Sequence, residues 1–226
     1  MKLIYYGHSC FAVETNGTTL LFDPFIRPNE LAKSIAVESL KAHYILLSHG
    51  HEDHLADAAE IAHRTGATIV SNYEVVVWFG KKGISKTHPM NHGGSWKFDF
   101  GQVKYTSAIH SSCLPDGTYG GNPGGFVVKT PEKTFYYSGD TALTMDMKLI
   151  GESAKLDFAV LPIGDNFTMG MDDAVLAADF IKCNKIIGVH YDTFGYIKLD
   201  HPLALQKFRA AGKELLLLKI GQSVMI

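Results

Sequence analysis

Cysteine is scarce in this chain of 226 residues, and its spacing excludes several classes of protein. The three cysteines, Cys10, Cys113 and Cys183, lie far apart and form no Cys-x-x-Cys pair. We therefore expect neither a disulfide framework nor a structural zinc knuckle. The same scarcity favours a reducing compartment, and we expect the cytoplasm.

The chain also lacks a basic excess and any long apolar run. Lysine and arginine number 21 against 23 acidic residues, so we do not expect nucleic acid as the main partner. The first residues show no signal-peptide core, and no apolar run is long enough to cross a membrane. Neither G-x-G-x-x-G nor G-x-x-x-x-G-K is present, which excludes these nucleotide-phosphate motifs.

What the chain does have is a dense histidine cluster, the stretch SHGHEDH at 48–54. An apolar run at 44–47 precedes it and indicates a buried strand. Apolar residues at helical spacing follow it, so the cluster lies on a strand-to-helix loop. On alternation, His49 and His51 point one way while Asp53 and His54 point elsewhere, which suits two neighbouring metal sites. A solvated loop is the alternative, but short His-rich tracts usually bind metal.

The pattern His49-x-His51-x-Asp53-His54 resembles the H-x-H-x-D-H signature of the metallo-β-lactamase fold superfamily. The stretches GHS at 7–9 and HYDTF at 190–194 are similar to those of its small uncharacterised metal-dependent hydrolases, which are related to the ascorbate-phosphate lactonase branch. The resemblance implies an α/β (α+β) fold, a four-layer αββα sandwich of two mixed sheets with outer helices. It covers nearly all of 1–226 as one domain, with two similar halves that meet near 111–125.

The resemblance also implies a first metal site made of three histidines. His49 and His51 would supply two ligands from the loop. His110, which follows a predicted strand at 102–109, would supply the third. His88 and His92 lack motif spacing, and we expect them to be loop histidines.

A second metal site is implied beside the first. Asp53, His54 and His190 would hold this ion, and His190 follows a predicted strand at 185–189. Asp140, in the Gly-Asp-Thr at 139–141, would bridge the two ions because a carboxylate has two oxygens. We expect two divalent ions, Zn²⁺ first, with Mn²⁺, Fe²⁺ or Ni²⁺ as alternatives.

Two further residues are implied beside the metals. His8 would face them as a substrate contact or proton donor, and we count it with Asp53 as catalytic. A histidine that only hydrogen-bonds its hairpin is the alternative for His8. Asp23 would orient a ligand from outside the coordination sphere, unless it merely starts a turn before Pro24.

Three segments complete the expectations. The glycine-rich segment 111–125 would be either a mobile lid or a plain linker. The segment 164–170 would line the edge of the site or form a turn that caps the next helix. The runs at 215–219 and 223–226 would both close the second sheet.

The expected function is hydrolysis of a small ester, lactone, amide or phosphodiester by a hydroxide held on metal. The alternatives are a nuclease or RNA-processing enzyme, an iron-dependent oxidoreductase of the same fold, and a metal-binding protein without turnover. We expect a small-molecule substrate and no membrane partner. Whether the chain forms a homo-oligomer stays open.

Overall fold

The short apolar segments of the sequence form two seven-stranded sheets in the computed structural model, which describes residues 1–226. The strands of the first sheet, in spatial order, are β14 (Ser223–Met225), β1 (Lys2–Gly7), β2 (Cys10–Thr15), β3 (Thr18–Phe22), β4 (Tyr44–Leu46), β5 (Thr68–Asn72) and β6 (Thr87–Met90). Those of the second are β13 (Glu214–Leu216), β12 (Lys185–Val189), β11 (Phe158–Pro162), β10 (Thr134–Tyr137), β9 (Gly124–Lys129), β8 (Gly101–Ser107) and β7 (Ser95–Phe98).

Both sheets are mixed in the same way. In the first sheet, β14 to β3 pair antiparallel and β3 to β6 pair parallel. In the second, β7 to β10 pair antiparallel and β10 to β13 pair parallel. The prediction of two mixed sheets is therefore confirmed.

Aromatic side chains from the two sheets fill the space between them. The Phe22 ring lies 6.3 Å from that of Phe126 and 5.9 Å from that of Phe135, between centroids. Phe11 meets Tyr137 edge to face at 5.1 Å. All five side chains are fully buried, and each buried phenylalanine contributes about 1.5–3 kcal/mol. This shared core fixes the two sheets face to face.

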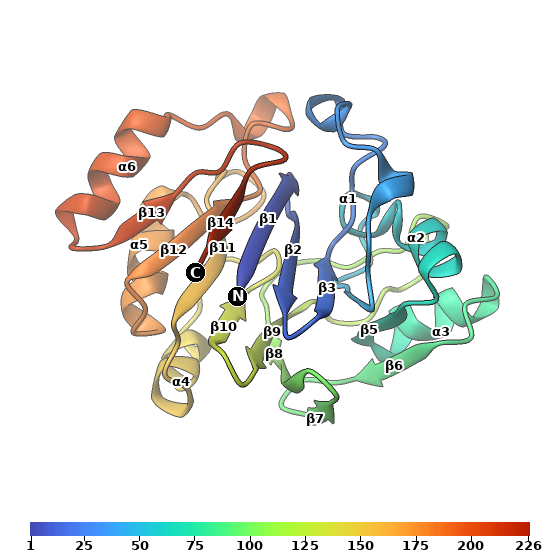
Figure 1. The fold of residues 1–226 in the computed structure, drawn as a ribbon. Helices are drawn as coiled ribbons and strands as arrows, with labels where there is room; N and C mark the ends of the chain where they lie inside the picture. The colour runs from blue at the N-terminus through green and yellow to red at the C-terminus, as the bar shows by residue number, and fades with distance from the viewer.

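Helices cover the outer faces, which completes the predicted αββα order (Figure 1). The helices that follow strands of the first sheet are α1 (Glu52–Leu55), α2 (Ala58–Thr65) and α3 (Tyr73–Lys81). Those that follow strands of the second are α4 (Asp146–Ser153), α5 (Met171–Phe180) and α6 (His201–Ala210). Single 3₁₀ turns lie at η1 (Glu30–Ala32), η2 (Val37–Ser39) and η3 (Gly195–Ile197). None of these helices has the length and apolar character needed to span a membrane.

The last strand departs from the sequence prediction. The run at 223–226 was expected in the second sheet, but β14 pairs with β1 in the first, with Leu3 opposite Val224. Hydrogen bonds from Gly221 N to Tyr5 O and from Tyr5 N to Gln222 O hold the preceding turn on β1. The strand thereby covers an edge that would otherwise leave peptide groups unpaired.

Two smaller expectations also change. His88 lies in strand β6 rather than in a loop, with its ring 4.9 Å from those of Trp96 and Phe98. The helix expected to follow the histidine cluster is divided into α1 and α2 at Asp57. The Asp57 carboxylate accepts hydrogen bonds from the Ile26 and Arg27 amides, so it anchors a neighbouring loop at the break.

Candidate metal centre

Strand direction brings the predicted site residues to one edge of the sandwich. His8 follows β1, and the histidine cluster follows β4, which runs parallel to β1 within the first sheet. His110, Asp140 and His190 follow β8, β10 and β12, which run parallel to one another within the second. Loops at the carboxyl ends of strands are where open α/β sheets place their ligands.

Three histidines form the first group. The ligand atoms of His49, His51 and His110 lie within 4.8 Å of one another. His49 Nε2 is 2.9 Å from His51 Nδ1, and the His110 ring centroid is 5.1 Å from both other rings. His49 is fully buried and the other two are partly exposed. The sequence predicted this trio as one metal site.

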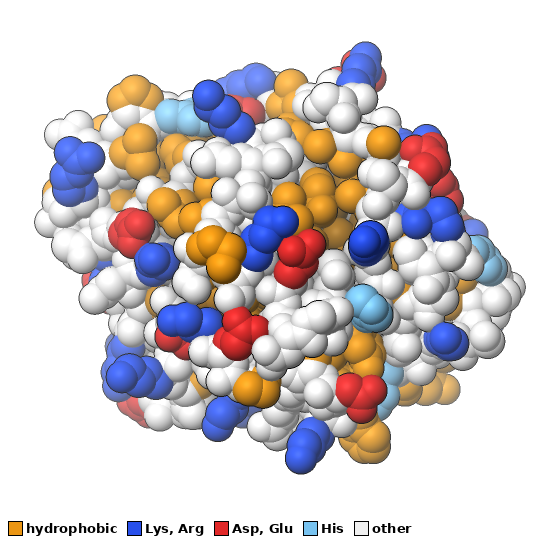
Figure 2. Space-filling view, viewed as in Figure 1, with side chains coloured by type: hydrophobic (Ala, Val, Ile, Leu, Met, Phe, Trp, Pro, Cys, Tyr) orange, Lys and Arg blue, Asp and Glu red, His pale blue; other side chains and the backbone are white.

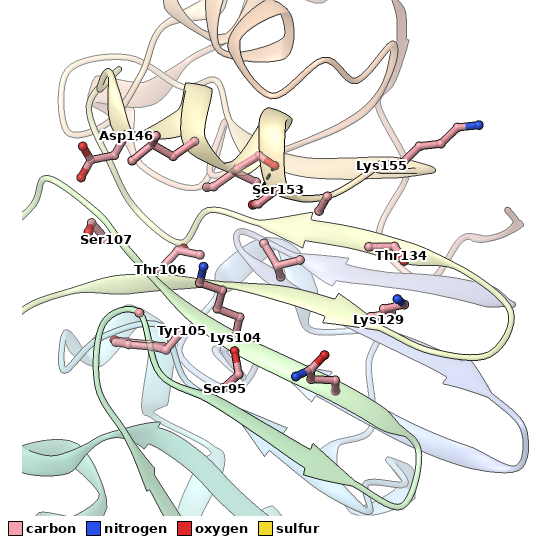
Figure 3. Close-up of a pocket in the computed structure, with 16 residues that line it drawn as sticks. Ser95, Lys104, Tyr105, Thr106, Ser107, Lys129, Thr134, Asp146, Ser153 and Lys155 are labelled. Carbon is pink, nitrogen blue, oxygen red and sulfur yellow. Dashed lines mark hydrogen bonds between the residues drawn. The ribbon is translucent and has the colours of Figure 1, made fainter.

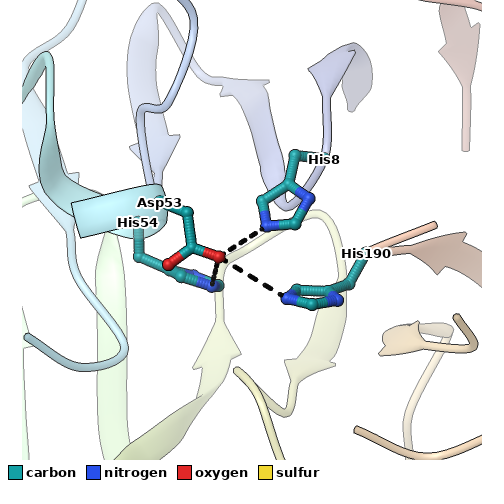
Figure 4. A group of neighbouring side chains, drawn as sticks. All are labelled: His8, Asp53, His54 and His190. Carbon is teal, nitrogen blue, oxygen red and sulfur yellow. Dashed lines mark hydrogen bonds and ion pairs between the residues drawn. The ribbon is translucent and has the colours of Figure 1, made fainter. Parts of the chain in front are cut away.

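Asp53, His54 and His190 form the second group, and His8 joins them (Figure 4). Asp53 Oδ2 lies 3.0 Å from His8 Nε2 and 3.8 Å from the Nε2 atoms of both His54 and His190. The His8 and His190 rings are 4.1 Å apart between centroids. The structure thus brings a fourth donor to the three expected from the sequence.

Asp140 lies between the two groups. Its Oδ2 is 2.9 Å from His190 Nε2 and 3.1 Å from His54 Nε2, both in the second group. The same oxygen is 3.7 Å from His110 Nε2 in the first group. Its other oxygen, Oδ1, is buried without a hydrogen-bond partner. An unpaired buried carboxylate oxygen is costly, and a bound cation would satisfy it.

Asp23 contacts His54 at the ring nitrogen that faces away from Asp140. Its fully buried carboxylate accepts hydrogen bonds from Tyr137 Oη and Ser48 Oγ at 2.5 Å, and from Ser48 N at 2.8 Å. Its Oδ2 also lies 2.7 Å from His54 Nδ1. This contact directs the opposite nitrogen of His54 toward Asp140, which is how a second-layer carboxylate orients a metal ligand.

The charge states of the groups fit cation binding. Burial lowers the pKa of His8 to about 4 and lowers the pKa of His49 well below its usual value. Burial favours a raised pKa for Asp53, but the neighbouring His54 and His8 outweigh it and hold that pKa low. Neutral imidazoles and an ionised carboxylate are the forms that bind divalent metals.

The pKa of His54 shifts in the opposite direction to that of His8 and His49. Burial alone would lower its pKa, but the carboxylates of Asp140, Asp53 and Asp23 raise that pKa well above the ordinary value. Its two ring nitrogens face Asp23 and Asp140. The three carboxylates place several negative charges around one buried imidazole, and a bound cation would balance them.

His8 has a polar partner at each ring nitrogen. Its Nδ1 lies 3.0 Å from Thr193 Oγ1, and its Nε2 lies 3.0 Å from Asp53 Oδ2. In one neutral tautomer Nε2–H donates to Asp53 and the Thr193 hydroxyl donates to Nδ1. In the other, Nδ1–H donates to Thr193 and the Nε2 lone pair is free to bind a cation in the second group.

Backbone strain is concentrated at this edge. His8, Asp23 and His190 have φ angles of 55°, 40° and 56°, in the left-handed region that non-glycine residues seldom adopt. Such conformations cost about 1–3 kcal/mol each and persist where the surroundings impose them, often at functional sites. The side chains that the sequence singled out are thus held in place by the fold.

Several supporting contacts were not found by sequence reasoning. Thr193 contacts His8 across 185 residues, and Tyr137 contacts Asp23 across 114. No local pattern marks either contact. In the glycine-rich segment, the Ser112 hydroxyl accepts a hydrogen bond from the Gly50 amide at 3.0 Å, which docks this segment on the histidine cluster. Whether the segment opens as a lid stays a prediction.

A separate cavity of about 610 Å³ lies between β8, β9, β10 and α4, on the outer face of the second sheet (Figure 3). Lys104, Lys129 and Lys155 are among its lining residues. It contains none of the histidines described above. The convergence of donor atoms, rather than cavity volume, therefore identifies the candidate site.

Comparison with known proteins agrees with this geometry. Residues 2–190 match the family model described as the beta-lactamase superfamily domain. The chain is 57% identical to a UPF0173 metal-dependent hydrolase of Flavobacterium johnsoniae and 52% identical to one of Methylacidiphilum infernorum, over at least 99% of each chain. A solved metallo hydrolase of Ignicoccus hospitalis is 34% identical, with a TM-score of 0.90, over 99% of this chain and 97% of that one.

Proposed function

We propose that this chain, which belongs to the beta-lactamase superfamily, is a metal-dependent hydrolase. We further propose that it holds two divalent cations side by side. The observation that carries this proposal is the position of Asp140 Oδ2. It lies within 3.1 Å of two imidazole nitrogens of one group and 3.7 Å from one of the other. A carboxylate between two clusters of imidazole donors suits a bridging ligand.

Each cation would have its own set of ligands. His49, His51 and His110 would hold the first. Asp53, His54 and His190 would hold the second, with Asp140 shared between the two. Histidine and carboxylate donors favour Zn²⁺, and Mn²⁺, Fe²⁺ or Ni²⁺ also accept them.

The residues around the cations would have distinct tasks. When bound, divalent cations lower the pKa of a coordinated water from 15.7 toward about 7 and polarise the substrate. Asp23 keeps the ring of His54 oriented through its 2.7 Å contact. The Thr193 hydroxyl can accept the Nδ1 proton of His8, which would leave the Nε2 lone pair for the second cation. We propose His8 as a fourth donor there, with the proton donor expected from the sequence as the alternative role.

The substrate we propose is a small ester or lactone, with a phosphodiester as the alternative. Figure 2 shows basic and acidic side chains interspersed over one face of the molecule, without a continuous basic patch. The net charge of −2 likewise offers little attraction to a polyanion. These observations favour a small molecule over nucleic acid as the substrate. Nothing in the chain calls for redox chemistry, so the oxidoreductase remains the weaker alternative.

A substrate panel tests the proposed function. Zinc-loaded and manganese-loaded protein would be assayed on phosphodiesters, lactones and thioesters beside simple esters. Asp140→Asn protein serves as the matched control, because it keeps the shape of the side chain without its charge. We expect hydrolysis of at least one class by the loaded protein and none by the control. Equal rates for both proteins would contradict the proposal.

A further inference from the structure

Two exposed aromatic rings lie together on loops that connect to the candidate metal centre. Phe167 is 47% exposed and Tyr196 is 78% exposed, and their ring centroids are 6.1 Å apart at an interplanar angle of 74°. They come from separate loops, the one between β11 and α5 and the one between β12 and α6. An edge-to-face pair of this kind has intrinsic stability, yet it leaves much apolar surface in water.

Both loops are anchored on residues of the centre. In the first loop, the Met169 amide donates to the Thr141 carbonyl, next to Asp140. A Cβ atom built on Gly164 would lie 2.0 Å from the His190 carbonyl oxygen, so this backbone is pressed against His190. Phe167 lies between these two attachments in the sequence, on a loop whose backbone is fixed next to Asp140 and at His190.

The second loop begins at His190 itself. Its Thr193 hydroxyl contacts His8, and the Asp192 amide donates to the Ile197 carbonyl at 2.7 Å, which closes a tight loop around Tyr196. A third ring of this loop, Phe194, lies 5.3 Å from the His8 ring between centroids. The loop that carries Tyr196 therefore also contacts His8 directly, through Thr193 and Phe194.

The charges on these two loops would not attract an anion. Residues 164–170 and 191–199 contain a single basic side chain, Lys198, and two carboxylates, Asp165 and Asp192. The Lys198 ammonium donates to the Asp192 carbonyl at 2.8 Å. Lys198 keeps its charge, and the Asp192 carboxylate is paired with His201 at 2.7 Å, so the two loops carry no excess of positive charge that would attract a phosphate or carboxylate on the substrate.

We propose that Phe167 and Tyr196 form a binding surface for an uncharged aromatic or bulky apolar group on the substrate. This inference rests on the proposed hydrolase function and narrows its substrate class to neutral esters or lactones with such a group. The group would cover the exposed rings, and apolar burial would hold it while the reacting bond meets the metals.

A matched pair of esters tests the surface. Ethyl phenylacetate and ethyl acetate share a leaving group that has no ring, and they differ by one phenyl ring. We expect metal-loaded protein to prefer the phenylacetate about tenfold or more in kcat/KM, because burying a ring contributes about 1.5–3 kcal/mol and each 1.4 kcal/mol is tenfold. Phe167→Ala and Tyr196→Ala should remove most of that preference through KM, with metal content unchanged.

Met225→Ala is the control variant, because Met225 is 70% exposed but pairs with Lys2, at the end of β1 away from His8. It should keep the full preference. A preference retained by both loop variants would overturn the inference. So would a higher kcat/KM for bis(p-nitrophenyl) phosphate than for either ester.

A binding measurement separates failure of the surface from failure of the enzyme. Calorimetry on the metal-loaded protein would compare 2-phenylacetamide with acetamide, both uncharged. We expect tighter binding of the phenyl compound, weakened about tenfold in the two loop variants and unchanged in Met225→Ala. If no ester is hydrolysed but this pattern holds, the hydrolase proposal fails and the surface stands. Equal binding of the two amides would overturn the surface, whatever the enzyme does.

Discussion

Asp140 joins two groups of imidazoles through one oxygen, so its removal should affect both. Asp140→Ala deletes the proposed shared ligand and leaves His54 and His190 without the carboxylate that contacts their Nε2 atoms. We expect both metal sites to weaken and hydrolysis to be lost. Metal analysis after dialysis measures the first effect and the substrate panel the second. Full metal content in this variant would show that Asp140 is not a bridge.

Asp23 should matter less than Asp140, because it touches a ligand rather than a cation. Loss of its contact with His54 Nδ1 frees the ring, and outer ligand contacts typically contribute about 10–100-fold in metal affinity or activity. We expect Asp23→Ala to lower metal affinity within that range, as measured by competition with a chelating dye. If Asp23→Ala lowered metal affinity as much as Asp140→Ala, Asp23 would bind a cation directly and its proposed role would be wrong.

His8 offers a test between two roles. The sequence predicts a proton donor, whose removal would keep the metals and reduce turnover about 10²–10⁴-fold. The geometry instead places His8 Nε2 3.0 Å from Asp53 Oδ2, within the second group. We therefore expect His8→Ala to weaken one metal site and to leave the site of His49, His51 and His110 unchanged. Retention of both metals with loss of turnover would restore the proton-donor role.

At the scale of secondary-structure elements, the centre depends on how closely the loops pack. Gly164 follows β11, and a Cβ atom there would lie 2.0 Å from the His190 carbonyl oxygen. Gly164→Ala should therefore displace His190 and lower metal content at the second site. Gly195→Ala is the control, because no atom lies within 4 Å of the Cβ position there. Equal metal content in the two variants would contradict this account of the loop.

Local sequence patterns predict most of the secondary-structure elements, but not all of their pairing. Alternating and apolar runs predicted most strands, and the ligands at strand ends followed from the family pattern. The pairing of β14 with β1 was missed because an edge strand carries no local mark of its partner. The contact of His8 with Thr193 was missed for a similar reason, since it depends on how two distant loops meet. Local patterns thus predicted most strands and the residues of the candidate site, but not which distant strands and side chains contact one another.

At the scale of the whole molecule, bound cations should stabilise the fold. The proposed ligands come from both sheets, so a cation that binds only the folded chain would draw the two sheets together. One site at a hundredfold excess over its dissociation constant contributes about 2.7 kcal/mol. For a chain of this length that corresponds to roughly 5–10 °C in Tm. Thermal melts with and without chelator should differ by at least this amount, and identical curves would contradict the prediction.

The number of cations per chain tests the central claim most directly. Two donor groups joined by Asp140 require two ions when both sites are filled. Elemental analysis of protein reconstituted with excess zinc and then desalted should approach about two equivalents per chain, as in other two-metal sites. A stable value of one, unchanged by further metal, would contradict the dinuclear account.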